Sequence, residues 1–94
     1  MTDLEYKEQD SQDIKIRALM ILTEVCGLSH SDVCSILRET DMLQVIHRMY
    51  EMLHQEGECA MMHHISEAMA ARGVDIPVPA LSDIRWQRWN SVRV

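Results

Sequence analysis

The sequence predicts a single all-α domain, a compact bundle of four main helices with a short fifth helix at the C-terminus. Apolar residues recur at intervals of three and four, and no six-residue segment alternates cleanly between apolar and polar residues as a half-buried strand does. Only three of the 94 residues are glycine and two are proline, which leaves long stretches free of helix breakers. A hydrophobic content of 47% supports one packed core, and the chain is too short for two domains.

The first strong helix is predicted from Asp13 to Cys26. Residues 1–12 are polar and are interpreted as an N-terminal arm, or as the solvated start of this helix, so that 13–94 form the domain. We expect Asp13 to cap the helix and Gly27 to end it. Its apolar stripe consists of Ile14, Ala18, Ile21, Leu22 and Val25.

The second helix is expected to begin at Ser29 or Ser31 and to end near Glu39. Ser29 is followed three residues later by Asp32, which is close to a capping box with aspartate in place of glutamate. Its short apolar face consists of Val33, Ile36 and Leu37.

The third helix, capped by Thr40 or Asp41, is predicted to extend to Gln55, and its apolar positions are too many for one partner face. They are Met42, Leu43, Val45, Ile46, Met49, Tyr50, Met52 and Leu53. We expect some of them to stay exposed in a 94-residue monomer, together with Trp89. Exposed apolar area marks interfaces, so the sequence predicts a homodimer with this helix or the C-terminal tail at its centre.

The fourth helix is predicted from about Glu58 to Ala71, with Gly57 before it and Arg72-Gly73 after it. Residues 74–79 read Val-Asp-Ile-Pro-Val-Pro and are predicted to form an extended strap, because each proline biases the preceding residue away from helix. Ser82 is then expected to cap the last helix, which carries Trp86 and Trp89.

Residues 19–38 resemble the general helix-turn-helix pattern, in which apolar residues stand at fixed offsets from a turn glycine. Around Gly27 these are Leu22, Cys26, Leu28, Val33 and Ile36. Thr23 departs from the pattern, which usually has a small alanine there. In a second register, helices 29–39 and 41–55 would be the motif helices, with Cys34 as the small residue, and would look like a winged-helix core without an obvious wing.

A DNA-binding regulator is therefore the first alternative function. Its candidate base-reading residues are His30, Ser31 and Ser35 in the first register and Gln44, His47 and Arg48 in the second. The charge disfavours this alternative, because neither set forms a basic footprint and the net charge is −6.

A helical zinc-binding module is the second alternative. His30 and Cys34, and likewise Cys59 and His63, stand four residues apart, a spacing at which two side chains on a helix can hold Zn²⁺. These four are weak candidates because zinc signatures are usually tighter. We therefore expect no metal and no cofactor, and three buried or half-buried thiols in a reducing cytoplasm.

Charge is distributed unevenly along the chain. Residues 1–13 contain five acidic residues and Lys7, whereas residues 59–94 contain four arginines and three acidic residues. This acidic head and mildly basic tail are expected to attract each other, within one chain or between two. No apolar run is long enough to span a membrane, and because the first residues are acidic we expect no secretory signal there.

The tail combines Trp86 and Trp89 with Arg85 and Arg88, the residue types that dominate protein interfaces. Trp86 is expected to fasten the tail to the core, whereas Trp89 is a candidate for an interface. No nucleophile elbow, phosphate-binding loop or paired-carboxylate pattern is present, so we predict that the chain is not an enzyme. The sequence predicts a cytoplasmic regulatory or inhibitory protein that binds another protein, with candidate contact residues Arg85, Trp86, Arg88, Trp89, Met49 and Met52.

Overall fold

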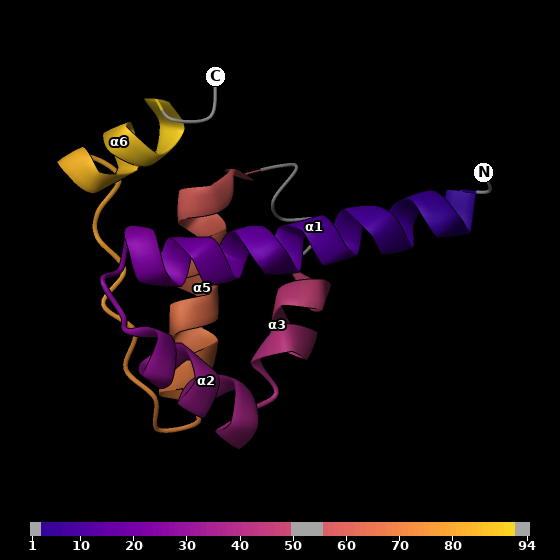
Figure 1. Cartoon of the computed structure of the whole chain (residues 1–94), viewed down its shortest axis with the longest axis horizontal. Coiled ribbons are helices and arrows are strands. Elements are labelled where there is room, and N and C mark those ends of the chain that lie inside the picture. The colour runs from indigo at the N-terminus through magenta and orange to yellow at the C-terminus, as the bar shows by residue number, and fades with distance from the viewer. Residues whose placement is uncertain (1–2, 50–55, 92–94) are drawn as a thin grey trace.

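The computed structural model describes residues 3–49 and 56–91 of the chain and confirms the all-α prediction (Figure 1). Its helices are α1 (Asp3–Glu24), α2 (His30–Glu39), α3 (Met42–Arg48), α5 (Glu58–Ala70) and α6 (Ile84–Ser91). Within the described residues no strand is present. The architecture is the predicted compact bundle, with a short C-terminal helix.

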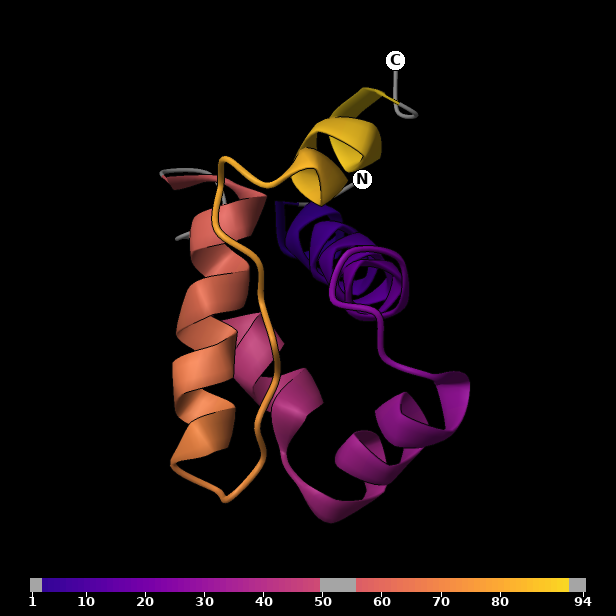
Figure 2. The same cartoon turned by 90° about the vertical axis from the view of Figure 1, so that its left-hand side faces the viewer.

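The long helix α1 is the central element of the bundle. It packs against α2, α3 and α6, and α3 in turn packs against α5. Figure 2 looks along α1 and shows α6 beside it at one end of the molecule and α2 at the other, with α5 forming the opposite side. The N-terminal half of α1 extends away from the other helices (Figure 1).

Helix α1 begins at Asp3, so the predicted start at Asp13 is wrong and Asp13 is no cap. The alternative interpretation of residues 1–12, as the solvated start of the helix, describes the backbone from Asp3 onward. Two features of the sequence explain the early start. No glycine or proline precedes Gly27, and the acidic residues Asp3 and Glu5 stand where the positive end of the helix dipole stabilises negative charge.

The turn between α1 and α2 follows the prediction. Gly27 has a φ of +76°, a left-handed conformation that a residue with a Cβ adopts only with strain. The Leu28 amide donates to the Leu22 carbonyl at 3.0 Å, which closes the end of α1. Ser29 caps α2, and its hydroxyl accepts a hydrogen bond from the Asp32 amide at 3.0 Å.

Helix α3 is shorter than predicted. It ends at Arg48, and the Met49 amide bonds to the carbonyls of both Val45 and Ile46, a tightened last turn of the 3₁₀ type. No glycine or proline marks this end in the sequence, so the prediction of one helix to Gln55 is wrong at this point. Residues 50–55, with Tyr50, Met52 and Leu53, lie outside the described residues.

Helix α5 and the strap after it were both predicted. Gly73, with a φ of +81°, ends the helix, and the Val74 amide donates to the Met69 carbonyl at 3.0 Å. Residues 74–80 then run back along α5 without helix, as Figure 2 shows. The Ser66 hydroxyl on α5 donates to the Ile76 carbonyl at 3.1 Å and holds the strap in place.

The cap of α6 is Asp83. The sequence had suggested Ser82, so this prediction is wrong. An Asp83 carboxylate oxygen accepts the backbone amide of Arg85 at 2.9 Å, and the Asp83 carbonyl accepts the amide of Trp86 at 3.1 Å. A carboxylate satisfies an orphan amide and also interacts favourably with the positive end of the helix, which a serine hydroxyl does less strongly.

One core connects all described helices. The predicted α1 stripe is buried in full, and methionines supply much of the bulk that phenylalanine would otherwise give. The buried apolar residues outside α1 include Val33, Ile36, Met42, Val45, Ile46, Met61, Met62, Ile65, Met69, Ile76, Trp86 and Trp89. Of the three cysteines, Cys26 is buried and Cys59 is half-buried, but Cys34 is exposed, contrary to the expectation for the thiols.

The described helices include none that combines the length and the apolar character needed to cross a membrane.

Candidate functional site

An open apolar groove lies between α1 and α2. Its volume is about 370 Å³, and the α1 side presents Ile16 and Met20, which are 56% and 43% exposed. These two side chains are one helical turn apart, so they form a continuous apolar ridge. The remaining lining residues are Leu19, Thr23, His30, Val33, Cys34 and Leu37.

The groove exists because α1 carries apolar residues on more than its core face. Ala18, Ile21 and Leu22 are fully buried against the bundle, whereas Ile16 and Met20 lie off that stripe. The Gly27 turn and the Ser29 cap then set α2 beside α1, with Val33 and Leu37 facing the same hollow. An apolar ridge beside a second helix is therefore left uncovered in the described chain.

The lining of the groove is mostly apolar. None of its described lining residues is aspartate, glutamate, lysine or arginine. Its polar groups are the Thr23 hydroxyl, the His30 ring and the Cys34 thiol. The Thr23 hydroxyl donates to the Met20 carbonyl of its own helix at 2.9 Å. Apolar walls with few polar groups recognise apolar side chains.

The four zinc candidates are not brought together. His30 and Cys34 line the groove on α2, whereas Cys59 and His63 are on α5. A ring nitrogen of His63 lies 3.1 Å from the Pro79 carbonyl oxygen of the strap. Among residues 3–49 and 56–91, no three histidine, cysteine, aspartate or glutamate side chains gather as a metal site.

The six candidate DNA-reading residues fall in two places. His30, Ser31 and Ser35 are on α2, with Ser31 exposed and Ser35 half-buried. A second hollow, of about 310 Å³, lies where α1 meets α3 and is lined by Lys15, Leu43, Gln44, His47 and Arg48. The structure thus gathers the second set beside a lysine, and we call this site the basic hollow. DNA binding itself stays a prediction.

The two tryptophans of the tail belong to the core. Trp86 is 2% exposed and its ring nitrogen donates to the Pro79 carbonyl at 2.8 Å. Trp89 is 6% exposed and its ring nitrogen donates to a Glu58 carboxylate oxygen at 3.0 Å. The expectation that Trp89 stays on the surface is therefore wrong, because α6 places both rings on the face that packs against the bundle.

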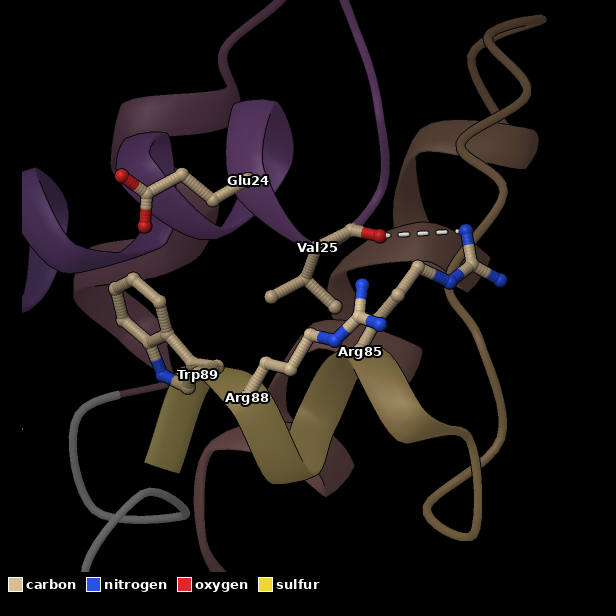
Figure 3. A pocket seen from close by; sticks show the side chains of 5 residues that line it. All are labelled: Glu24, Val25, Arg85, Arg88 and Trp89. Carbon is tan, nitrogen blue, oxygen red and sulfur yellow. Dashed lines mark hydrogen bonds between the residues drawn. The ribbon is translucent and has the colours of Figure 1, made fainter. Parts of the chain in front are cut away.

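The two arginines of α6 line a third hollow, of about 160 Å³, with Glu24, Val25 and Trp89. Figure 3 shows Arg85 and Arg88 beside Val25, with Trp89 across the hollow from Arg85. A guanidinium nitrogen of Arg85 donates to the Val25 carbonyl at 3.4 Å, so this arginine stabilises the C-terminal end of α1. Of the two methionines predicted as contacts, Met49 is half-buried and Met52 lies outside the described residues.

The Asp83 carboxylate is expected to titrate near pH 2. The Arg85 guanidinium donates to both carboxylate oxygens at 3.0 Å, and these hydrogen bonds are the main reason that the pKa of Asp83 falls from 3.8 to about 2. Because the folded-state pKa is the lower one, the stabilisation is complete above pH 3.8 and is lost as the pH falls through about 2.

Carboxyl NMR titration measures the pKa of Asp83 in the folded chain. Arg85→Ala should return the pKa of Asp83 toward its usual value, whereas an unchanged midpoint would contradict the pairing; Arg88→Ala is the control and should leave it low.

Three features of the structure were not predicted from the sequence. Ile16 and Met20 were detectable as apolar residues four apart outside the α1 stripe. The carboxylate of Glu58 joins three helices, because it also pairs with Arg17 of α1, and nothing local signals this. The Arg72 guanidinium holds Asp41 at 2.5 and 3.0 Å across 31 positions of sequence, and these hydrogen bonds lower the pKa of Asp41.

Comparisons with curated proteins and with solved structures found no match. A family model described as protein of unknown function (DUF3791) matches residues 21–72, more than half of the 94 residues. The matched segment contains α2, α3 and α5 entirely and the C-terminal end of α1. It includes the α2 wall of the apolar groove and the α3 wall of the basic hollow, and it ends before the strap. The chain belongs to the DUF3791 family of proteins of unknown function.

Proposed function

We propose that this chain is a small non-enzymatic regulatory or inhibitory protein that binds an amphipathic helix of another protein in the groove between α1 and α2. The observation that carries the proposal is the exposed ridge of Ile16 and Met20 facing Val33 and Leu37 of α2. An amphipathic helix covers such a surface with apolar side chains spaced three and four residues apart.

The negative net charge of the chain favours a partner helix with a basic surface. The net charge is −6, so a helix with a basic polar face is attracted over long range while its apolar face fills the groove. The flexible Met20 side chain can repack around different apolar anchors. The groove is broad and open and its lining is apolar, which favours a helix over a small polar metabolite.

The test uses a fluorescein-labelled amphipathic peptide with leucines at helical spacing and lysines on its polar face. Anisotropy titration should show binding to the unmodified chain, and Met20→Glu should weaken it at least about tenfold, because a charge is placed among apolar walls. Ile84→Glu is the matched control, since Ile84 is also exposed but lies on α6. Equal binding by Met20→Glu and the unmodified chain would contradict the proposal.

The same titration with duplex DNA separates this function from the helix-turn-helix alternative. Binding to DNA would weaken steeply with added salt, because phosphate contacts release counterions. In the peptide complex, added salt should weaken only the long-range attraction of the lysine face, because the apolar contacts in the groove release no counterions. The net negative charge supports the protein partner over DNA.

We further propose that the chain acts in the cytoplasm and forms a homodimer. Unpaired cysteines support the reducing compartment. Self-association is supported by Leu43, which is 40% exposed on α3, the helix that the sequence predicts at the dimer centre.

A further inference from the structure

The basic hollow combines positive charge with an apolar wall. Lys15 comes from α1, whereas His47, Arg48 and the exposed Leu43 come from α3. Arg48 is weakly engaged within the chain, because its guanidinium lies 3.8 Å from Asp41 and its side chain is 63% exposed. Asp41 is already held at 2.5 and 3.0 Å by Arg72. The positive charge of the hollow is that of Lys15 and Arg48.

The complementary charge lies in the N-terminal half of α1. Residues 1–13 carry five acidic residues against Lys7, and the backbone is helical from Asp3. This half of α1 extends away from the other helices (Figure 1). We call residues 3–13 the acidic arm.

The outer part of the acidic arm cannot reach the basic hollow of its own chain. Asp3–Glu24 is one unbroken helix of 22 residues, about 33 Å long at 1.5 Å per residue, and Lys15 is part of it. No glycine or proline in this helix allows the arm to fold back onto the surface that begins at Lys15. The outer part of the arm can therefore reach such a hollow only in another molecule.

We propose that the basic hollow binds the acidic arm of a second copy of this chain. Two copies related by a two-fold axis near residues 10–15 place each arm across the Lys15 and α3 surface of the other, so the contact is made twice. The two α1 helices then run antiparallel, which sets their dipoles in a favourable orientation. The acidic arm of the second copy then covers Leu43, and its carboxylates pair with Arg48. This inference rests on the proposed homodimer and names its surfaces.

The dimer is expected to depend on salt, because its contacts are charged and close to solvent. Sedimentation equilibrium of the full chain at micromolar concentration should give twice 10.9 kDa at about 0.05 M salt and a shift toward monomer at about 0.5 M. A monomer at both salt concentrations would overturn the homodimer and this inference together. It would not bear on helix binding in the groove, which the peptide titration tests separately.

A charge exchange tests the surfaces themselves. Lys15→Glu with Arg48→Glu makes the hollow acidic, and Glu8→Lys with Asp10→Lys makes the arm basic. Each double variant alone should weaken dimerisation at least about tenfold, and an equimolar mixture should restore it, because each arm then meets an opposite charge. Circular dichroism checks that both variants stay helical.

Arg38→Glu with Arg88→Glu is the matched control, with the same change of charge outside the basic hollow and with both positions exposed. This variant should dimerise like the unmodified chain. Full dimerisation of Lys15→Glu with Arg48→Glu would overturn the inference and place the dimer contact elsewhere, for example in the apolar groove. Failure of the mixture to restore the dimer would also overturn it. A monomeric unmodified chain that binds duplex DNA in a salt-sensitive way would overturn the inference too, if Lys15→Glu with Arg48→Glu abolishes that binding.

Discussion

Replacing Trp86 by alanine is expected to lower the free energy of unfolding by roughly 3–5 kcal/mol. Trp86 is among the largest fully enclosed side chains, and it closes the core at the junction of the strap and α6. Its loss leaves a cavity and removes the indole hydrogen bond to the Pro79 carbonyl. A domain of this size is only marginally stable, so the variant should be largely unfolded near physiological temperature. Urea unfolding followed by circular dichroism measures the change.

Two companion variants make this result interpretable. Trp86→Phe keeps an aromatic ring but loses the hydrogen bond to Pro79, so it should be destabilised less than the alanine variant. Leu81→Ala removes a side chain that is 70% exposed and should stay within about 0.5 kcal/mol of the unmodified chain. If Trp86→Ala unfolds at the same urea concentration as Leu81→Ala, the tail is not part of the core.

Replacing Glu58 by alanine is expected to cost about 2 kcal/mol, the second largest effect. One carboxylate oxygen accepts from the Trp89 ring nitrogen at 3.0 Å, and the other pairs with the Arg17 guanidinium. Glu58 also stands in the first turn of α5, where the helix dipole favours a negative charge. Its removal takes away the carboxylate that accepts from the buried Trp89 indole and loosens α6 from α1 and α5.

The control for Glu58 lies on the same helix. Glu67→Ala removes a carboxylate whose side chain is 80% exposed and should change the unfolding free energy by no more than about 0.5 kcal/mol. Glu58→Gln retains an acceptor for Trp89 but loses the charge that pairs with Arg17, so it should fall between the two. Tryptophan fluorescence should report a more solvated indole in Glu58→Ala, and an unchanged spectrum with unchanged stability would show that the carboxylate does not hold Trp89.

Local rules were sufficient where an element depends on its own residues. The Ser29 cap, the glycine stops at Gly27 and Gly73, and the proline-rich strap all appear where the sequence predicts them. Each depends on steric or hydrogen-bonding preferences within a few residues. The α1 stripe was predicted in full for a similar reason, because helical periodicity reports which face must be covered.

Helix ends without such markers were predicted less well. The start of α1 at Asp3 and the end of α3 at Arg48 are not marked by glycine or proline. In α6, serine and aspartate stand side by side, and both are good capping residues. The pairing of Asp83 with Arg85 distinguishes them, because a carboxylate can accept the backbone amide and the guanidinium of the same residue.

The amino-acid sequence by itself determined the helical class, the order of the helices and the face of α1 that enters the core, because these follow from periodicity and local stereochemistry. Tertiary structure decided which apolar residues stay exposed. Trp89 is buried because α6 packs its ring against the bundle, where Glu58, 31 residues away, accepts from the ring nitrogen. Ile16 and Met20 remain uncovered because α2 packs beside them and not over them. Such outcomes depend on pairs of residues far apart in the chain, and only the folded arrangement brings those pairs together.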